Sequence, residues 1–220
     1  MNIIKTIQKS IPFLSETWKE LYAPFLEEEP LYAFAKALLI FTQQGIPSDY
    51  GLPYFKEEVT PDPEFVLEHF KPLFQATDTT PEQWAKAIEA TPFEHLLVIM
   101  GQRWTSASIK DIRALPPSEK ALLESCFAPY NDQITMVTRA WEKHMGRSSD
   151  AFWGIAKGNP TQKEETIKKQ ITKMIQTQTW WNIFYHYKHA LVYEIRVPSG
   201  HGIRWNKEGT QLIGFLEPFL

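Results

Sequence analysis

The C-terminal stretch that decides the fold reads ALVYEIRV (190–197), PSGHG (198–202) and IRWNKEGTQLIGFLEPFL (203–220). In its first run, Leu191, Tyr193 and Ile195 fall on one side. Glu194 and Arg196 fall on the other. This period of two is typical of a half-buried strand. The glycines that follow indicate a tight turn, and two more short apolar runs come after it. The stretch therefore predicts a small antiparallel sheet of about three strands.

The residues before this stretch have the spacing of helices. Apolar residues recur every three or four positions, and short helical segments are separated by prolines. Capping residues stand at the expected helix starts, namely Ser15, Thr80, Thr91, Ser118 and Asn159. Glu94, three residues after Thr91, also fits a capping box. We therefore expect an α+β protein with a mostly helical N-terminal region and a small C-terminal antiparallel sheet.

Charge and proline content suggest two regions. Residues 1–134 contain 11 Lys and Arg against 19 Asp and Glu, a balance of −8, whereas residues 135–207 contain 12 against 5, a balance of +7. We place an acidic, proline-punctuated helical region at 1–115 and a basic α+β unit, ending in a β-meander, at 116–220. One compact domain remains the alternative. The charge separation fits either an anionic ligand of the basic part or two regions that dock on each other.

The composition of the 220 residues, 43% hydrophobic and 22% charged, is that of a globular protein. The single cysteine, Cys126, cannot form an internal disulfide, and its apolar neighbours indicate a packing residue. The N-terminus lacks a secretory signal, and no run approaches the ~18 apolar residues of a membrane span. We expect a cytoplasmic protein without membrane contact, and export without a cleavable signal remains open.

Several short motifs lie in the last ninety residues. They are RAWEKH (139–144), FWG (152–154), ExR (194–196), GHGIRW (200–205) and GFLEP (214–218). In these motifs the chain resembles a family of small, functionally uncharacterised proteins. His201 stands where the family pattern has Tyr. The resemblance implies no activity.

The same motifs contain the candidate site residues. The candidates for proton transfer are His144, His201 and Glu194, and Glu217 is a further carboxylate that could orient an imidazole or act as a base. The candidates for ligand binding are Arg139, Lys143, Arg147, Arg196, Arg204, Trp205, Gly200 and Gly202. Arg and Lys suit phosphate or carboxylate groups, and glycine turns let backbone N–H groups approach an anion. The alternatives are a surface ion pair for Glu194 and Arg196, a helix C-terminus for Lys143 and His144, and core packing for the Trp residues.

Three functions fit these residues. The leading interpretation is binding of, or action on, an anionic phosphate-bearing small molecule such as a nucleotide, and whether the chain is an enzyme is left open. The alternative is a protein–protein interaction module without catalysis. The third is nucleic-acid binding through the lysines of residues 163–173. The sequence has no nucleotide-binding loop, zinc motif or cysteine pair, and the spacing of His186 and His189 alone does not favour zinc, so we expect no cofactor and no metal.

Overall fold

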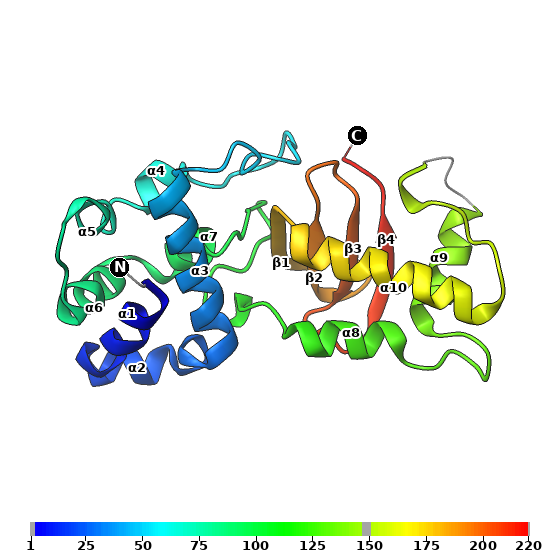
Figure 1. The fold of residues 1–220 in the computed structure, drawn as a ribbon, viewed down its shortest axis with the longest axis horizontal. Coiled ribbons are helices and arrows are strands. Elements are labelled where there is room, and N and C mark those ends of the chain that lie inside the picture. The colour runs from blue at the N-terminus through cyan, green and yellow to red at the C-terminus, as the bar shows by residue number, and fades with distance from the viewer. Residues whose placement is uncertain (1–2, 147–150, 220) are drawn as a thin grey trace. The chain divides into compact units, whose positions relative to one another are not determined.

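The computed structural model describes residues 3–146 and 151–219, which form two compact units (Figure 1). The first unit consists of Met1–Tyr50 and Glu57–Leu115, and the second of Gly51–Lys56 and Pro116–Leu220. The predicted border after residue 115 assigned Gly51–Lys56 to the first region, whereas the structure assigns this segment to the second unit. That the units are independent domains stays a prediction.

The first unit is helical. Its α-helices are α1 (Ile3–Ser10), α2 (Glu16–Leu21), α3 (Glu28–Gln44), α4 (Pro63–Val66), α5 (Lys71–Gln75), α6 (Pro81–Ala90) and α7 (Phe93–Ile99). Its 3₁₀ helices are η1 (Ile11–Phe13), η2 (Ala23–Leu26) and η3 (Ile112–Ala114). Helix α1 packs against α3 and α6, and fully buried rings fill the core, among them Phe25, Phe34, Phe70 and Trp84. Burial of such large apolar side chains is the main stabilising term of a helical array.

Most of the predicted helix starts of both units are confirmed. Ser15 and Ser118 accept hydrogen bonds from the first turns of α2 and of α8 (Glu119–Phe127), and Thr80 and Asn159 form full capping boxes. The prediction for Thr91 is wrong. Its hydroxyl donates to the carbonyl of Ala87, 2.8 Å away, and so closes α6. Helix α7 begins after Pro92 instead, because a Thr hydroxyl next to a helix end can bond backward as well as forward.

The second unit combines helices with the sheet. Its helices are α8 (Glu119–Phe127), α9 (Met136–Met145), η4 (Ala151–Trp153) and α10 (Pro160–Thr177). Its strands are β1 (Trp180–His186), β2 (Ala190–Arg196), β3 (Gly202–Asn206) and β4 (Leu212–Leu216), all antiparallel to their neighbours in the order of the sequence. Figure 1 shows α10 running across the front of this sheet. The expected α+β class is confirmed.

The sheet has one strand more than the expected three. Strand β1 comes from the segment that the sequence presents as a cluster of aromatic residues, and it pairs with β2 over its whole length, with Asn182 opposite Glu194. The first four residues of β1 are buried. Strands buried on both faces read as continuous apolar runs, so the period of two that reveals β2 is hidden in β1.

The two faces of the sheet have different chemistry. One face is apolar and contains Ile195, Ile203 and Trp205, all fully buried. Cys126 of α8 lies beside Trp205, and burial raises the pKa of its thiol to about 12. The thiol therefore stays protonated at neutral pH, in agreement with a packing role. The other face carries Glu194 and Arg196, buried as well but charged.

Gly202 lies opposite Arg196 in the pairing of β2 and β3. A Cβ at this position would lie 2.5 Å from the carbonyl oxygen of Ile195 and 2.8 Å from the Cγ of Arg196. We expect Gly202→Ala to lower the free energy of unfolding by about 1–3 kcal/mol, because backbone atoms have to move. Gly51→Ala is the control, since a Cβ there meets nothing within 4 Å, and its effect should stay within about 0.5 kcal/mol. Chemical denaturation of both variants checks this, and equal effects would contradict it.

No helix among the described residues is long and apolar enough to cross a membrane.

Candidate functional site

Three ionisable side chains meet at the end of the sheet where β2 and β4 finish and β3 begins. His144 lies in the last turn of α9, His201 in the loop between β2 and β3, and Glu217 directly after β4. The Nε2 atom of His144 is 2.7 Å from one carboxylate oxygen of Glu217. The Nε2 atom of His201 is 3.6 Å from the other oxygen. A carboxylate flanked by two imidazoles is a group that can accept and donate protons near neutral pH.

The three side chains differ in their access to solvent. The Glu217 side chain is 41% exposed, that of His144 17% and that of His201 7%. A substrate can therefore reach Glu217 most easily and His201 least. The Nδ1 atom of His201 is 2.9 Å from the hydroxyl of Ser199. This second bond fixes the plane of the His201 ring.

Aromatic rings hold the two imidazoles in place. Phe152 stacks on His201 with ring centroids 3.8 Å apart and planes 2° from parallel. The ring of Trp153 lies edge-on to His144 and His201, with centroids 5.1 Å and 5.8 Å away. The indole N–H of Trp141 in turn donates to the carbonyl of Trp153 over 2.8 Å. The segment that carries Phe152 and Trp153 is thus tied to α9, the helix that supplies His144.

Arg196 links the two chain segments that carry His201 and Glu217. Its guanidinium donates to the carbonyl oxygen of Gly200 over 2.6 Å and to that of Glu217 over 2.7 Å. It also lies over the ring of Phe219, 3.8 Å from the centroid. Burial lowers the pKa of the Arg196 guanidinium, and the nearby Glu194 carboxylate opposes that shift. The guanidinium is thus buried, with hydrogen bonds to two backbone carbonyls and to the Glu194 carboxylate.

Glu194 joins Arg196 to Arg204. Only 1% of Glu194 is exposed. Its Oε1 accepts a hydrogen bond from Nε of Arg196 over 2.6 Å, and its Oε2 accepts one from Nε of Arg204 over 2.8 Å. Arg204 stands directly opposite Glu194 in the sheet. The interpretation of Glu194 and Arg196 as a surface ion pair is therefore wrong. Both side chains are buried, and Glu194 also binds a second arginine, Arg204.

The structure brings some of the sequence candidates together and separates others. His144, His201, Arg196, Gly200 and Gly202 gather at the end of the sheet. Glu194 lies one step away, with both oxygens engaged by arginines, so a role in proton transfer does not fit its surroundings. Trp205 is fully buried on the opposite face, so its ring is not available to a ligand. Arg139 and Lys143 are exposed on α9, and Arg147 lies outside the described residues.

Sequence reasoning undervalued Glu217 and missed Phe152. Glu217 is the group that both imidazoles share, yet the sequence indicates it only as a further carboxylate that could orient an imidazole or act as a base. Its signal is its place in the GFLEP motif, directly after the last residue of β4. Phe152 stacks on His201, and its FWG motif supplies Trp153 as well. The periodicity of a sequence does not predict such ring contacts, because they form between segments about fifty residues apart in the chain.

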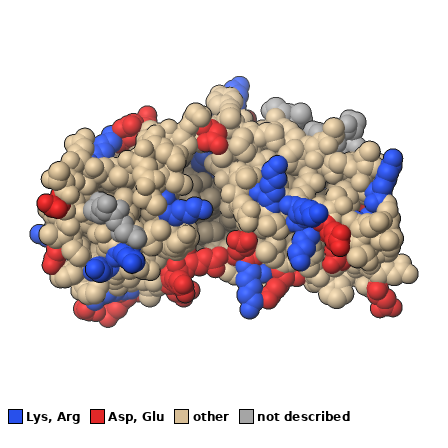
Figure 2. All heavy atoms as spheres, in the orientation of Figure 1, with Lys and Arg blue, Asp and Glu red and all other residues tan. Residues whose placement is uncertain are grey.

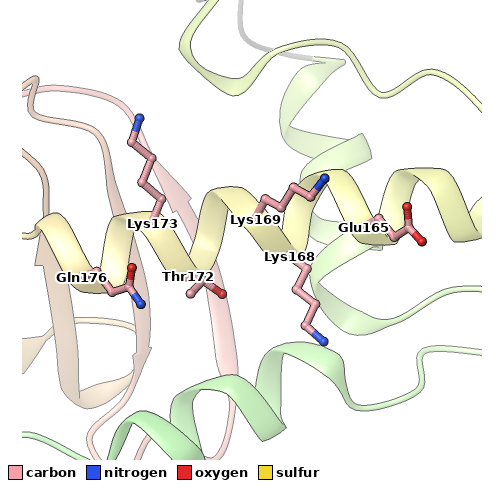
Figure 3. Close-up of a pocket in the computed structure, with 6 residues that line it drawn as sticks. All are labelled: Glu165, Lys168, Lys169, Thr172, Lys173 and Gln176. Carbon is pink, nitrogen blue, oxygen red and sulfur yellow. The ribbon is translucent and has the colours of Figure 1, made fainter.

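The lysines of α10 form a separate surface feature. A shallow hollow there is lined by Glu165, Lys168, Lys169, Thr172, Lys173 and Gln176 (Figure 3). Figure 2 shows Lys and Arg side chains gathered over the face of the second unit that α10 crosses. In Figure 3 the lysines point in different directions along the helix. None of the site's imidazoles lines this hollow, and the described residues contain no cluster of His, Cys, Asp or Glu that could hold a metal ion.

Comparison with known proteins points to one family. Residues 123–217 match the family described as "CdiA C-terminal tRNase toxin domain". The match includes His144, His201 and Glu217 and lies within the second unit.

One solved structure is similar to part of the chain. It is the toxic C-terminal tip of CdiA from Pseudomonas aeruginosa in complex with an immune protein, at 26% sequence identity, with 43% of this chain and 99% of that chain covered and a TM-score of 0.38. No curated protein matches the chain.

These findings correct two interpretations of the sequence. The resemblance to a functionally uncharacterised family is wrong, because residues 123–217 match a family that is described as a tRNase toxin domain. The leading function, a phosphate-bearing small molecule such as a nucleotide, is wrong as well, because the matching family is described by its action on tRNA. The same description contradicts the alternative function, a protein–protein interaction module without catalysis. It also contradicts the third place that nucleic-acid binding received among the three functions.

Proposed function

We propose that the second unit is a ribonuclease toxin domain that cleaves tRNA. The match of residues 123–217 to the tRNase toxin family carries this proposal. The geometry of the site supports it, because cleavage of an RNA phosphodiester needs one group that takes a proton and one that gives a proton. His144 and Glu217 supply one group of each kind, and the 2.7 Å contact between them opens when the phosphate enters, because the attacking and leaving oxygens lie on opposite sides of the phosphorus.

The residues suggest the following division of work. Glu217, the most exposed of the three groups, accepts the proton of a ribose 2′-hydroxyl. The 2′-oxygen then attacks the adjacent phosphorus, and the bond from phosphorus to the 5′-oxygen breaks. His144, in its protonated form, gives its proton to that leaving oxygen. The products are a 2′,3′-cyclic phosphate and a 5′-hydroxyl. His201, buried between Phe152 and Glu217, positions the carboxylate.

Incubation of the purified chain with tRNA tests the proposal. We expect discrete tRNA fragments on a denaturing gel, with a 2′,3′-cyclic phosphate at the new 3′ ends. A DNA oligonucleotide should stay intact, because it lacks the 2′-hydroxyl that attacks the phosphorus. Intact tRNA after treatment with the folded chain would contradict the proposal. Cleavage of the DNA control would leave a nuclease but overturn the 2′-hydroxyl route.

We further propose a protein partner that blocks this site. A cell that makes a tRNA-cleaving toxin has to keep it inactive, which requires an inhibitor that covers the site or the RNA surface. The complex named for the Pseudomonas CdiA tip and its immune protein is a partnership of this kind.

A further inference from the structure

Helix α9 presents two cations on the side that faces solvent. Arg139 and Lys143 are four residues apart, so they lie on one face of the helix. Both are exposed, and neither forms an ion pair with any of the residues described. By contrast Glu142, between them in sequence, is paired with Lys163 over 2.7 Å. Two uncompensated positive charges at this spacing favour a polyanion.

An exposed aromatic ring stands beside these cations. The side chain of Tyr130 is 51% exposed, and the guanidinium of Arg139 lies 5.8 Å from its ring centroid. The backbone around the ring is held: the N–H of Tyr130 donates to the carbonyl of Ile134 over 3.0 Å. A fixed, solvent-facing ring next to a guanidinium is the combination on which unpaired bases stack. The exposed Asp132 in the same loop is the one nearby negative charge in the sequence segment 130–135.

The same helix leads from these residues to the candidate site. His144 directly follows Lys143, and α9 rises about 1.5 Å per residue, so Arg139 and His144 are about 7.5 Å apart along the helix axis. His144 is also turned by about 100° from Lys143 around the helix, so a strand that contacts Arg139 and Lys143 through its phosphates has to curve around the end of α9 to reach His144 and Glu217.

We propose that three residues bind the RNA strand that the site cleaves, namely Tyr130, Arg139 and Lys143. We call them the α9 strip, because two of them lie on α9 and Tyr130 lies beside Arg139. The tyrosine stacks on an unpaired base, and the two cations contact phosphates. This inference rests on the proposed function and adds to it how the substrate is held. It also assigns the substrate class, an RNA with an unpaired segment, since bases inside a helix have no free face to stack on.

The salt dependence of tRNA binding tests the α9 strip. We would measure binding of labelled tRNA to the Glu217→Gln chain, which has lost the proposed base but keeps its size, by fluorescence anisotropy from low to physiological salt. Each phosphate contact contributes about 0.7–0.9 to the slope of log K against log salt. Replacing Arg139 and Lys143 together by Ala should reduce this slope by about 2. Tyr130→Ala should weaken binding by about five- to a hundredfold without changing the slope, because a neutral ring releases no counterions.

Matched controls come from the same unit. Lys169→Ala with Lys173→Ala removes two exposed lysines of α10, and Tyr187→Ala removes a tyrosine that is 85% exposed. Both controls should bind tRNA like their parent. If the two double variants, on α10 and on α9, lost tRNA affinity equally, the attraction would be diffuse and the inference would be overturned. An unchanged salt slope in the variant without Arg139 and Lys143 would overturn it as well.

The outcomes separate this inference from the proposed function. Should the wild type cleave tRNA while the α9 variants bind it like the parent, the binding strip fails and the ribonuclease stands. Should the wild type leave tRNA intact while the slope falls as expected, cleavage fails and the RNA-binding strip stands.

Discussion

Replacement of Glu217 by Gln is expected to slow tRNA cleavage by about 10²–10⁴-fold, the usual contribution of a positioned general base. The amide keeps the size of the side chain but accepts no proton at neutral pH. The contact with His144, 2.7 Å in the wild type, can still form through the amide oxygen or nitrogen. The loss should therefore appear in kcat and not in KM. Gel-based rates under single-turnover conditions measure it directly.

His144→Ala tests the partner group of this pair. We expect a loss of similar size, and the double variant should be hardly worse than either single one, because residues that act as a unit have non-additive effects. Glu208→Gln is the control, since Glu208 is an exposed carboxylate on the turn between β3 and β4. If Glu217→Gln cleaves tRNA at the wild-type rate and unfolds at the same temperature, Glu217 is not the base.

Glu194→Ala is expected to destabilise the second unit by about 3–5 kcal/mol. The carboxylate is 1% exposed and is bonded to both Arg196 and Arg204. Removing it leaves two guanidinium groups close together, one of them buried without its counter-ion, which is costly. The midpoint of urea unfolding measures the effect.

Two comparisons make the Glu194 result specific. Glu208→Ala removes an exposed carboxylate of the same unit and should change stability by no more than about 0.5 kcal/mol. Glu194→Gln keeps the shape and some hydrogen bonds but loses the charge, so its effect should lie between the two. A loss below about 1 kcal/mol in Glu194→Ala would show that the arginines find other partners or that water reaches them.

The sequence predicts the architecture well where one face of an element differs from the other. The alternation from Leu191 to Arg196 reveals β2, and the capping residues locate α2, α6, α8 and α10. Strand β1 is hidden because apolar and aromatic side chains occupy both of its faces, so that Asn182 alone interrupts the run from Trp180 to Tyr185 and no alternation is visible. Thr91 misleads because its hydroxyl bonds back into α6.

The candidate site is predictable in its residue types and not in its pairings. The motifs nominate His144, His201 and Arg196, and these do gather in one place. Sequence gives no means to decide that Glu217, and not Glu194, stands between the two imidazoles. Both glutamates follow a similar apolar pattern, and the difference arises from their partners in the fold: Glu194 lies within β2 between two arginines, whereas Glu217 lies just after β4 between the imidazoles. Function was missed for the same reason, since clustered Arg and His fit a nucleotide as well as an RNA strand.

Arg196 has a consequence for how this site can be altered. Its guanidinium donates hydrogen bonds to the main-chain oxygens of Gly200 and Glu217. Every amino acid has such a main-chain oxygen. The geometry of the two segments is thus independent of which side chain stands at position 217. A designer who wished to exchange the reactive group, for example for an aspartate or a histidine, would start from a frame that is already held in place.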